Sequence, residues 1–140
     1  MTISISSVDK SQMKAVIDIL QSISIYEPKE KEYNKIWNNF QSQSNNYGLV
    51  ATNEKQDVVG YGSILIENKI RGGKLGHIED IAIHKNFRKK GIGRLLINAL
   101  CEIAKQERCY KIALSCKDTN LNFYKKSNFI LSGLYLAKLL

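Results

Sequence analysis

The stretch that decides the fold and the site is Arg88-Lys89-Lys90-Gly91-Ile92-Gly93. Its two glycines carry no Cβ, so the backbone can turn tightly there and approach a ligand closely. Apolar side chains then recur at helical spacing from Ile92 to Ala104, which predicts an amphipathic helix that begins at this turn. The start of a helix presents unpaired N–H groups and about half a positive elementary charge, and the neighbouring Arg and Lys add full charges. The segment therefore predicts a pyrophosphate site.

Two commoner phosphate-binding patterns do not describe this segment. It lacks the GxxxxGKS or GxxxxGKT pattern of a P-loop, and it lacks the third glycine of a Rossmann fingerprint. Taken alone, it also fits a plain loop that leads into a helix without binding anything.

The elements expected around this segment mix strands and helices. Alternating or β-branched runs predict strands at residues 3–6, 47–52, 58–67, 77–84, 109–115, 129–132 and 134–139. Helical spacing predicts a helix capped by Asp9 and extending through Ile23, a shorter one after Pro28, the long one over 92–104 and a last one over 118–126. Residues 69–74 are basic, contain two glycines and are expected to form a mobile loop. This order predicts a mixed α/β domain rather than a helical bundle or a pure sandwich.

Size and composition limit the possible classes. The chain has 140 residues, 44% of them hydrophobic, which suits a single domain with a real core. No run approaches the ~18 apolar residues needed to cross a bilayer, and the N-terminus lacks the features of a signal peptide, so we expect a soluble cytoplasmic protein. The three cysteines lack zinc-ligand spacing and the two histidines cannot complete a metal site, so we expect free thiols and no metal.

The net charge of +8 is concentrated in the second half of the chain. Residues 1–68 contain 6 Lys and Arg against 8 Asp and Glu, a net charge of −2, whereas residues 69–140 contain 15 against 5, a net charge of +10. The densest cluster comprises Lys85, Arg88, Lys89, Lys90 and Arg94. Such a cluster indicates an anionic partner, either nucleic acid or a phosphorylated small molecule, although a solvated basic surface has the same composition.

A second candidate segment runs from Asn120 to Phe129 and contains adjacent aromatic residues, Phe123 and Tyr124. On a short helix these two side chains face different directions, so one can pack while the other points into a cleft. A tyrosine hydroxyl can donate a proton to a departing thiolate where water is excluded. The alternative is that both rings belong to the core.

Together these segments resemble the GNAT acetyltransferase superfamily. Residues 88–93 are similar to its coenzyme A pyrophosphate loop, and Asn120…Tyr124…Phe129 is similar to its later N-x-x-x-Y-x-x-x-x-F segment. Two further strings, Gly76-His77-Ile78-Glu79-Asp80-Ile81 and Cys109-Tyr110-Lys111-Ile112, resemble the glucosamine-6-phosphate N-acetyltransferases within it. The resemblance implies a single domain over residues 1–140 with the GNAT fold, in which about four helices flank a mixed sheet of six to seven strands whose middle strands splay apart.

The resemblance also implies acetyl-coenzyme A as co-substrate, without a metal. Backbone groups of Ile81, Ala82 and Ile83 are expected to pair with its pantetheine arm as an added strand would. The other expected cofactor-binding residues form the pyrophosphate loop and the opposite wall: Arg88, Lys89, Lys90, Gly91, Gly93, Arg94, Asn120, Phe123, Tyr124 and Lys126. Tyr124 matches the tyrosine that returns a proton to the coenzyme thiolate, after an amine has attacked the thioester directly in a ternary complex.

The implied acceptor is glucosamine 6-phosphate, and the product N-acetylglucosamine 6-phosphate. Glu79 and Asp80 match the acidic pair of the family and are catalytic candidates, but strict strand alternation sends adjacent side chains to opposite faces, so we expect at most one to face the amine. Ser115 replaces an acidic residue that helps to orient the amine in this family, and it offers a hydroxyl without a charge. The expected phosphate-binding cations are Lys69, Arg71, Lys74 and Lys138. The family also implies a homodimer in which the end of one chain completes the other's pocket.

Three other functions fit parts of the pattern. The chain could acetylate another small amine, such as a polyamine, or a protein N-terminus. It could be a basic nucleic-acid-binding domain, although only Phe87 interrupts the basic cluster as a stacking residue. It could also be an inactive module that binds coenzyme A and regulates a partner.

Overall fold

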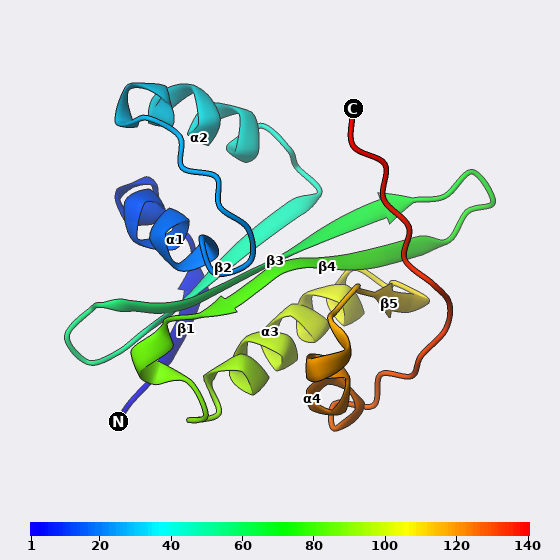
Figure 1. Ribbon diagram of the computed structural model, residues 1–140. Coiled ribbons are helices and arrows are strands. Elements are labelled where there is room, and N and C mark those ends of the chain that lie inside the picture. The colour runs from blue at the N-terminus through cyan, green and yellow to red at the C-terminus, as the bar shows by residue number, and fades with distance from the viewer.

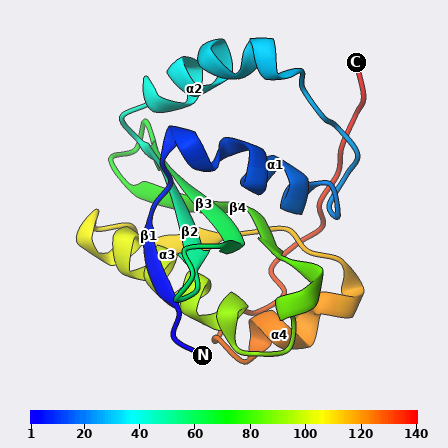
Figure 2. The ribbon, with the colours of Figure 1, turned by 90° about the vertical axis from the view of Figure 1, so that its left-hand side faces the viewer.

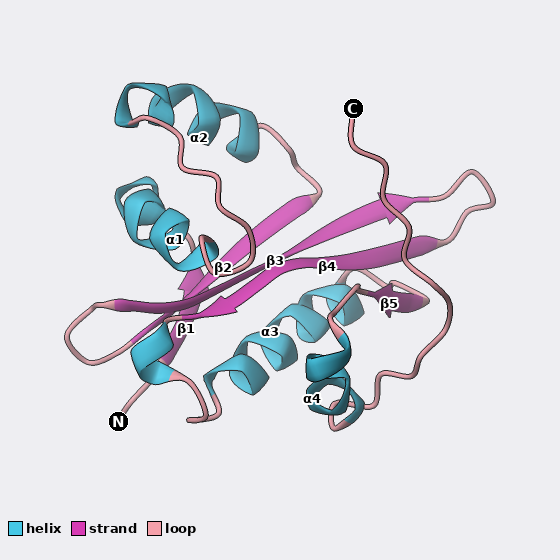
Figure 3. Ribbon diagram, in the orientation of Figure 1, coloured by secondary structure: helices cyan, strands magenta, loops and turns pink.

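The computed structural model describes all residues, 1–140, and shows one five-stranded sheet with helices on both faces (Figures 1 and 3). The strands are β1 (Ser4–Ser7), β2 (Asn46–Thr52), β3 (Val58–Asn68), β4 (Lys74–Ile83) and β5 (Lys111–Ala113). The α-helices are α1 (Met13–Leu20), α2 (Tyr33–Gln41), α3 (Ile92–Gln106) and α4 (Leu121–Lys125). Short 3₁₀ turns precede α1, α2 and α4, and another follows β4. The expected mixed α/β class and the four helices are confirmed.

The sheet follows chain order, and its pairing changes only at the last strand. Strands β1 to β4 pair antiparallel as successive neighbours, whereas β5 pairs parallel to β4 after the chain has crossed through α3. Helices α1 and α2 lie over one face, and α3 and α4 lie over the other (Figures 1 and 2).

The main core lies between α3 and the sheet. Leu96, Ile97 and Leu100 of α3 are fully buried, as are Val59 and Ile64 of β3. The helical spacing of the three residues on α3 explains its buried face. Strand β3 is buried along most of its length, because helices cover both faces of the sheet there. This packing fixes the start of α3, and therefore the glycine turn, against the end of β4.

The two N-terminal helices are anchored unequally. Asp9 accepts a hydrogen bond from the Ser11 backbone N–H, and Gln12 closes a capping box, so the predicted cap is confirmed at the 3₁₀ turn that leads into α1. Helix α1 buries Met13, Val16 and Ile19. Helix α2 buries no residue completely, although Ile36, Trp37 and Phe40 recur on one side of it.

A bulge interrupts the β3–β4 ladder. Tyr61 pairs with Ala82 but Ser63 pairs with Glu79, so β4 has one extra residue between these two pairs. The burial pattern changes at the same point, because Glu79 and Asp80 are both exposed while the residues around them alternate. Asp80 has a φ of 57°, the left-handed conformation that Asp and Asn tolerate better than most residues.

Strands β4 and β5 pair only at their beginnings. Their ladder runs from Leu75↔Lys111 to His77↔Ala113, and beyond it β4 continues to Ile83 without β5 beside it. The expected splaying of the middle strands is therefore confirmed, and the outer edge of β4 is free over its second half.

The expected strands at 129–132 and 134–139 are wrong, so the sheet has five strands rather than six or seven. After α4 the chain runs extended past the edge of the sheet and ends on the side of α1 and α2 (Figures 1, 2 and 3). A strand needs a partner with free backbone groups, and three-residue β5 offers few of them. Every residue from Ile130 to Leu140 is exposed.

Candidate active site

The glycine turn before α3 presents a row of free donors. Gly91 has a φ of 83° and Lys89 a φ of 62°, so the backbone curls in the left-handed region on both sides of Lys90. No backbone carbonyl accepts from the N–H groups of residues 88–94. A Cβ built at Gly91 would meet no atom within 4 Å. The turn is therefore an empty cradle of N–H groups at the positive end of a helix, which suits a diphosphate.

The basic side chains around this turn serve different purposes. Arg88 donates from Nε to the carbonyl of Ile83 at 3.2 Å, which ties the loop to the end of β4. Arg94 donates from Nη2 to the carbonyl of Lys126 at 3.1 Å, which joins the start of α3 to the end of α4. Arg88, Lys89 and Arg94 are all exposed, so their charges add to the positive end of the helix without an acidic partner.

A cleft of about 890 Å³ opens where β4 and β5 separate, and we name it the β4–β5 cleft. Ten of the thirteen predicted cofactor-binding residues line it: Ile81, Ala82, Ile83, Arg88, Lys89, Gly91, Gly93, Asn120, Phe123 and Tyr124. Lys90, Arg94 and Lys126 lie outside its lining. The structure thus brings the free edge of β4, the glycine turn and the aromatic pair of α4 around one space.

Tyr124 is buried at the wall of this cleft. Its ring packs edge-on against Phe123 at 5.0 Å and Phe129 at 6.0 Å between centroids. Burial raises the pKa of Tyr124, and the neighbouring Cys116 thiol raises it further. The phenol therefore stays protonated and can donate its proton. Phe123 is more exposed and approaches Gly93, where an added Cβ would lie 3.0 Å from the ring. The two rings do diverge, but both line the cleft.

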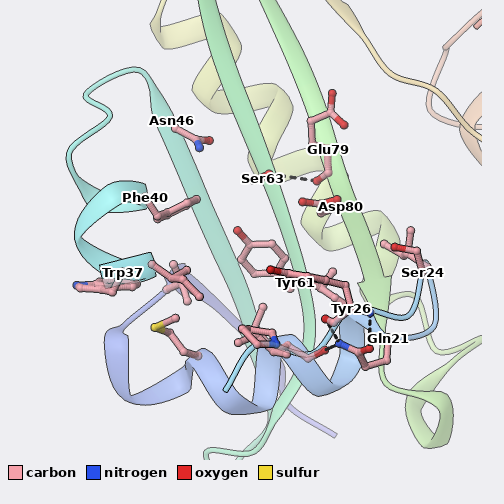
Figure 4. Close-up of a pocket in the computed structure, with 18 of the residues that line it drawn as sticks. Gln21, Ser24, Tyr26, Trp37, Phe40, Asn46, Tyr61, Ser63, Glu79 and Asp80 are labelled. Atoms are coloured by element: carbon pink, nitrogen blue, oxygen red, sulfur yellow. Dashed lines mark hydrogen bonds between the residues drawn. The ribbon is translucent and has the colours of Figure 1, made fainter. Parts of the chain in front are cut away.

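A second cleft, of about 590 Å³, lies between α1, α2 and the sheet (Figure 4). We name it the α1–α2 cleft. Its walls are apolar side chains of both helices, including Leu20, Ile36, Trp37 and Phe40, and its floor includes Tyr61 of β3. Burial raises the pKa of Tyr61 to about 12, and the nearby Asp80 carboxylate raises it as well.

Glu79 and Asp80 line both clefts, which makes them the boundary between the two spaces. The expectation that only one of them faces the site is wrong, because the extra residue of the bulge breaks the alternation and leaves both side chains on the α1–α2 side (Figure 4). The Ser63 hydroxyl donates to the Glu79 carbonyl at 3.2 Å and holds the bulge. Partial enclosure raises the pKa of Asp80, so a cationic partner would stabilise its ionised form.

The cations predicted to bind the acceptor's phosphate lie apart from both clefts within one chain. Lys69, Arg71 and Lys74 are at the tip of the β3–β4 hairpin, and Lys138 is in the exposed tail. Lys69 also pairs with Glu67 at 3.1 Å. Ser115, in contrast, lines the β4–β5 cleft.

Sequence reasoning missed most of the α1–α2 cleft and several residues of the β4–β5 cleft, among them Ser22, Ile23, Cys116, Lys117 and Tyr135. The apolar sides of the first two helices could have indicated the α1–α2 cleft, because two amphipathic helices on one face of a sheet enclose an apolar space between them and the sheet. Nothing local marks Ser22 or Tyr135, which approach the cleft only through tertiary structure.

Other kinds of site are not formed. No three His, Cys, Asp or Glu side chains lie close enough together to hold a metal ion. All three cysteines are free thiols. None of the helices combines the length and apolar character that crossing a membrane demands.

Comparison with known proteins agrees with this geometry. Residues 13–129 match the Acetyltransferase (GNAT) family. Glucosamine 6-phosphate N-acetyltransferase 1 of Dictyostelium discoideum is 35% identical over 128 residues, covering 89% of this chain and 82% of that protein. The Candida albicans enzyme of the same name is 33% identical over 74% of this chain and 71% of its own length. The crystal structure of glucosamine-6-phosphate N-acetyltransferase from Arabidopsis thaliana superposes with a TM-score of 0.93 at 26% identity, covering 99% of both chains. This chain therefore belongs to the GNAT acetyltransferase family and is an acetyl-CoA-dependent N-acetyltransferase with the GNAT fold.

Proposed function

We propose that the acceptor is glucosamine 6-phosphate and the product N-acetylglucosamine 6-phosphate. The observation that carries the proposal is the position of Glu79 and Asp80 between the two clefts, because an amine held there faces a thioester in the β4–β5 cleft. The relatives named for this reaction support the choice of amine. The cations that line the β4–β5 cleft, Arg88, Lys89 and Lys117, suit phosphate-bearing substrates.

In this proposal the free donors of residues 88–94 and the Arg88 and Lys89 charges hold the diphosphate of acetyl-coenzyme A. Lys90, Arg94 and Lys126 add to the positive potential from outside the cleft. The unpaired edge of β4 at Ile81, Ala82 and Ile83 pairs with the pantetheine arm, and Asn120, Phe123 and Tyr124 cover its other side. Bound in this way, acetyl-coenzyme A supplies the activated acetyl group.

The acidic pair holds the acceptor's ammonium and passes one proton from it to water. Much of the acceleration then comes from holding the two substrates in the attacking geometry. A β4 backbone N–H stabilises the oxyanion that develops on the thioester carbonyl. Tyr124 donates its phenolic proton to the departing thiolate and regains the second proton that the nitrogen loses on forming the amide. Burial raises the pKa of Tyr124, which keeps the phenol protonated before this step. None of the three cysteines is needed as a nucleophile, because the amine attacks directly.

We also propose that the protein acts as a homodimer. Leu134, Leu136, Leu139 and Leu140 of the tail are each about nine-tenths exposed or more, and a second copy would remove them from water. A second copy could also bring Lys69, Arg71, Lys74 or Lys138 to the acceptor's phosphate, which these residues do not reach within their own chain. The three free thiols suit a reducing compartment such as the cytoplasm.

Two measurements test the proposal. Thiol release from acetyl-coenzyme A should be far faster with glucosamine 6-phosphate than with glucosamine or a lysine-bearing peptide. Equal rates with glucosamine 6-phosphate and with glucosamine would show that the protein does not recognise the phosphate. Light scattering should give the mass of a dimer for the full chain, and a monomer with full sugar-phosphate activity would contradict the role of the second copy.

A further inference from the structure

One side chain holds the loop that leaves α1. Gln21 follows the last residue of this helix, and its Nε2 donates to the Ile17 carbonyl at 3.0 Å and to the Tyr26 carbonyl at 2.7 Å. Its Oε1 accepts from the Tyr26 backbone N–H at 2.9 Å (Figure 4). Both N–H groups and the oxygen of the amide are therefore used, and they join the loop to the end of α1.

The path of this loop depends on the Gln21 amide. Residues 25–28 form no backbone hydrogen bond other than the two between Tyr26 and Gln21. All three bonds of the amide lie within one chain, so they do not require a second copy of the protein. Removing the amide would leave residues 25–28 without a hydrogen bond to hold their backbone.

The loop held in this way meets both clefts. Ser22 lines the β4–β5 cleft and Ser24 lines the α1–α2 cleft, while Ile23 between them lines both. Glu79 and Asp80 are the only other residues that line both clefts. Ile23 therefore lies with the acidic pair at the junction where, in the proposed function, the amine meets the thioester.

The side chain that the loop presents at this junction is apolar. The Ser22 hydroxyl donates to the Ile19 carbonyl at 3.0 Å, so it is engaged at the end of α1. Ile23 has no hydrogen-bonding group in its side chain, and its effect on a thioester is to displace water. The acetyl carbon of a thioester reacts with water as well as with an amine, so a site that excludes water favours transfer over hydrolysis.

We propose that Gln21 is a positioning residue: its amide fixes the loop so that Ile23 keeps water from the thioester. In the hydrolysis that this arrangement suppresses, a water oxygen bonds to the acetyl carbon and the C–S bond breaks. Acetate, the coenzyme thiol and one proton are released. The inference rests on the proposed position of the thioester in the β4–β5 cleft, but not on glucosamine 6-phosphate as the acceptor.

Hydrolysis of acetyl-coenzyme A without any amine tests this on the full chain. Gln21→Ala should raise the rate of thioester loss at saturating acetyl-coenzyme A by about fivefold or more, because water then reaches the acetyl carbon. Gln43→Ala is the matched control and should leave the rate unchanged. The Gln43 Nε2 donates to the Phe40 carbonyl at 3.5 Å near the end of α2, and this residue does not line the β4–β5 cleft. A wild-type rate in Gln21→Ala, or an equal rise in Gln43→Ala, would overturn the inference.

A double substitution separates positioning from a general loosening of the fold. Ile23→Ala should raise hydrolysis by itself, and adding Gln21→Ala should raise it little further, because both changes act through one side chain. Two effects that multiply independently would overturn the role of Ile23 as the link.

The pH dependence of Gln21→Glu tests the hydrogen bonds themselves. A carboxylate at this position accepts from the Tyr26 N–H but cannot donate to either carbonyl, whereas a protonated carboxyl can donate to one. The excess of hydrolysis over wild type should therefore shrink as the pH falls toward about 4.3, the ordinary pKa of glutamate, while the excess in Gln21→Ala should not. An excess in Gln21→Glu that stays constant with pH would overturn the inference.

Thiol release with glucosamine 6-phosphate is measured in parallel. If the sugar does not accelerate thiol release by the wild-type protein, the proposed acceptor is wrong. The hydrolysis rates of the variants without amine still decide the role of Gln21 in that case.

Discussion

Replacing Gly91 by alanine tests two roles of this residue: its left-handed backbone in the fold and its place in the proposed diphosphate site. Gly91 has a φ of 83°, and left-handed backbone costs a residue with a Cβ roughly 1–2 kcal/mol. No atom lies within 4 Å of the added Cβ, so the chain itself offers no further clash. At about 3–4 °C per kcal/mol for a chain of this size, Tm should fall by about 3–8 °C. If a diphosphate occupies the empty space, the Cβ should also displace at least one charge-assisted hydrogen bond of about 1.5–3 kcal/mol.

Thermal unfolding with and without acetyl-coenzyme A measures both effects. Ligand at about 100 times its Kd stabilises the wild-type protein by about 2.7 kcal/mol, and a tenfold weaker Kd would roughly halve that gain. Gly72→Ala is the matched control, since Gly72 has a φ of 95°, an equally empty surrounding and a position at the hairpin tip. Gly72→Ala should lower Tm by a similar amount, while acetyl-coenzyme A should stabilise this variant as much as it stabilises the wild-type protein. A Gly91→Ala protein that melts lower but gains as much from the ligand as wild type would refute the assignment of the turn to the diphosphate.

Three further substitutions test other parts of the site. Tyr124→Phe should lower kcat by about 10²-fold, with little change in the affinity for acetyl-coenzyme A measured by calorimetry. A kcat within twofold of wild type would show that Tyr124 is not the proton donor. Asp80→Asn should lower activity yet raise Tm at pH 7, because burial raises the pKa of Asp80 and its ionisation opposes folding. The Tm difference should shrink as the pH falls toward the ordinary value of 3.8, and a difference independent of pH would show that charge is not the cause. Gly62→Ala should destabilise by about 1–3 kcal/mol in chemical denaturation, because its Cβ overlaps Ile81. Gly133→Ala, in open space, should not, and equal stabilities of the two variants would contradict this packing.

The parts of the fold that could be predicted from sequence are those fixed by local pattern. The long helix, the β2–β3 hairpin and the Asp9 cap follow from apolar spacing and from the chemistry of one or two side chains. The glycine turn was recognisable because its sequence requires unusual backbone and precedes a strong helix. The contribution of its charged neighbours was less predictable, since Arg94 hydrogen-bonds across to α4.

The parts that could not be predicted depend on partners distant in sequence. The bulge at Glu79 and Asp80 arises from how β4 pairs with β3, and no pattern within β4 reveals an extra residue. The apolar alternation of residues 134–139 suggested a strand, but a strand forms only beside a free edge of sufficient length. The α1–α2 cleft was missed because its walls come from two helices and a sheet that meet only in the folded chain.

The extra residue in β4 makes this part of the gene intolerant of small insertions and deletions. Glu79 pairs with Ser63 and Ala82 pairs with Tyr61, and deleting the Ile81 codon between them would restore strict alternation along β4 while keeping both acidic residues. One acidic side chain would then turn toward Leu100 and the interior, with no counter-charge to receive it. Homologues that keep the acidic pair should therefore keep the length of this strand even where its apolar residues vary, and an alignment that places gaps there should coincide with loss of the pair.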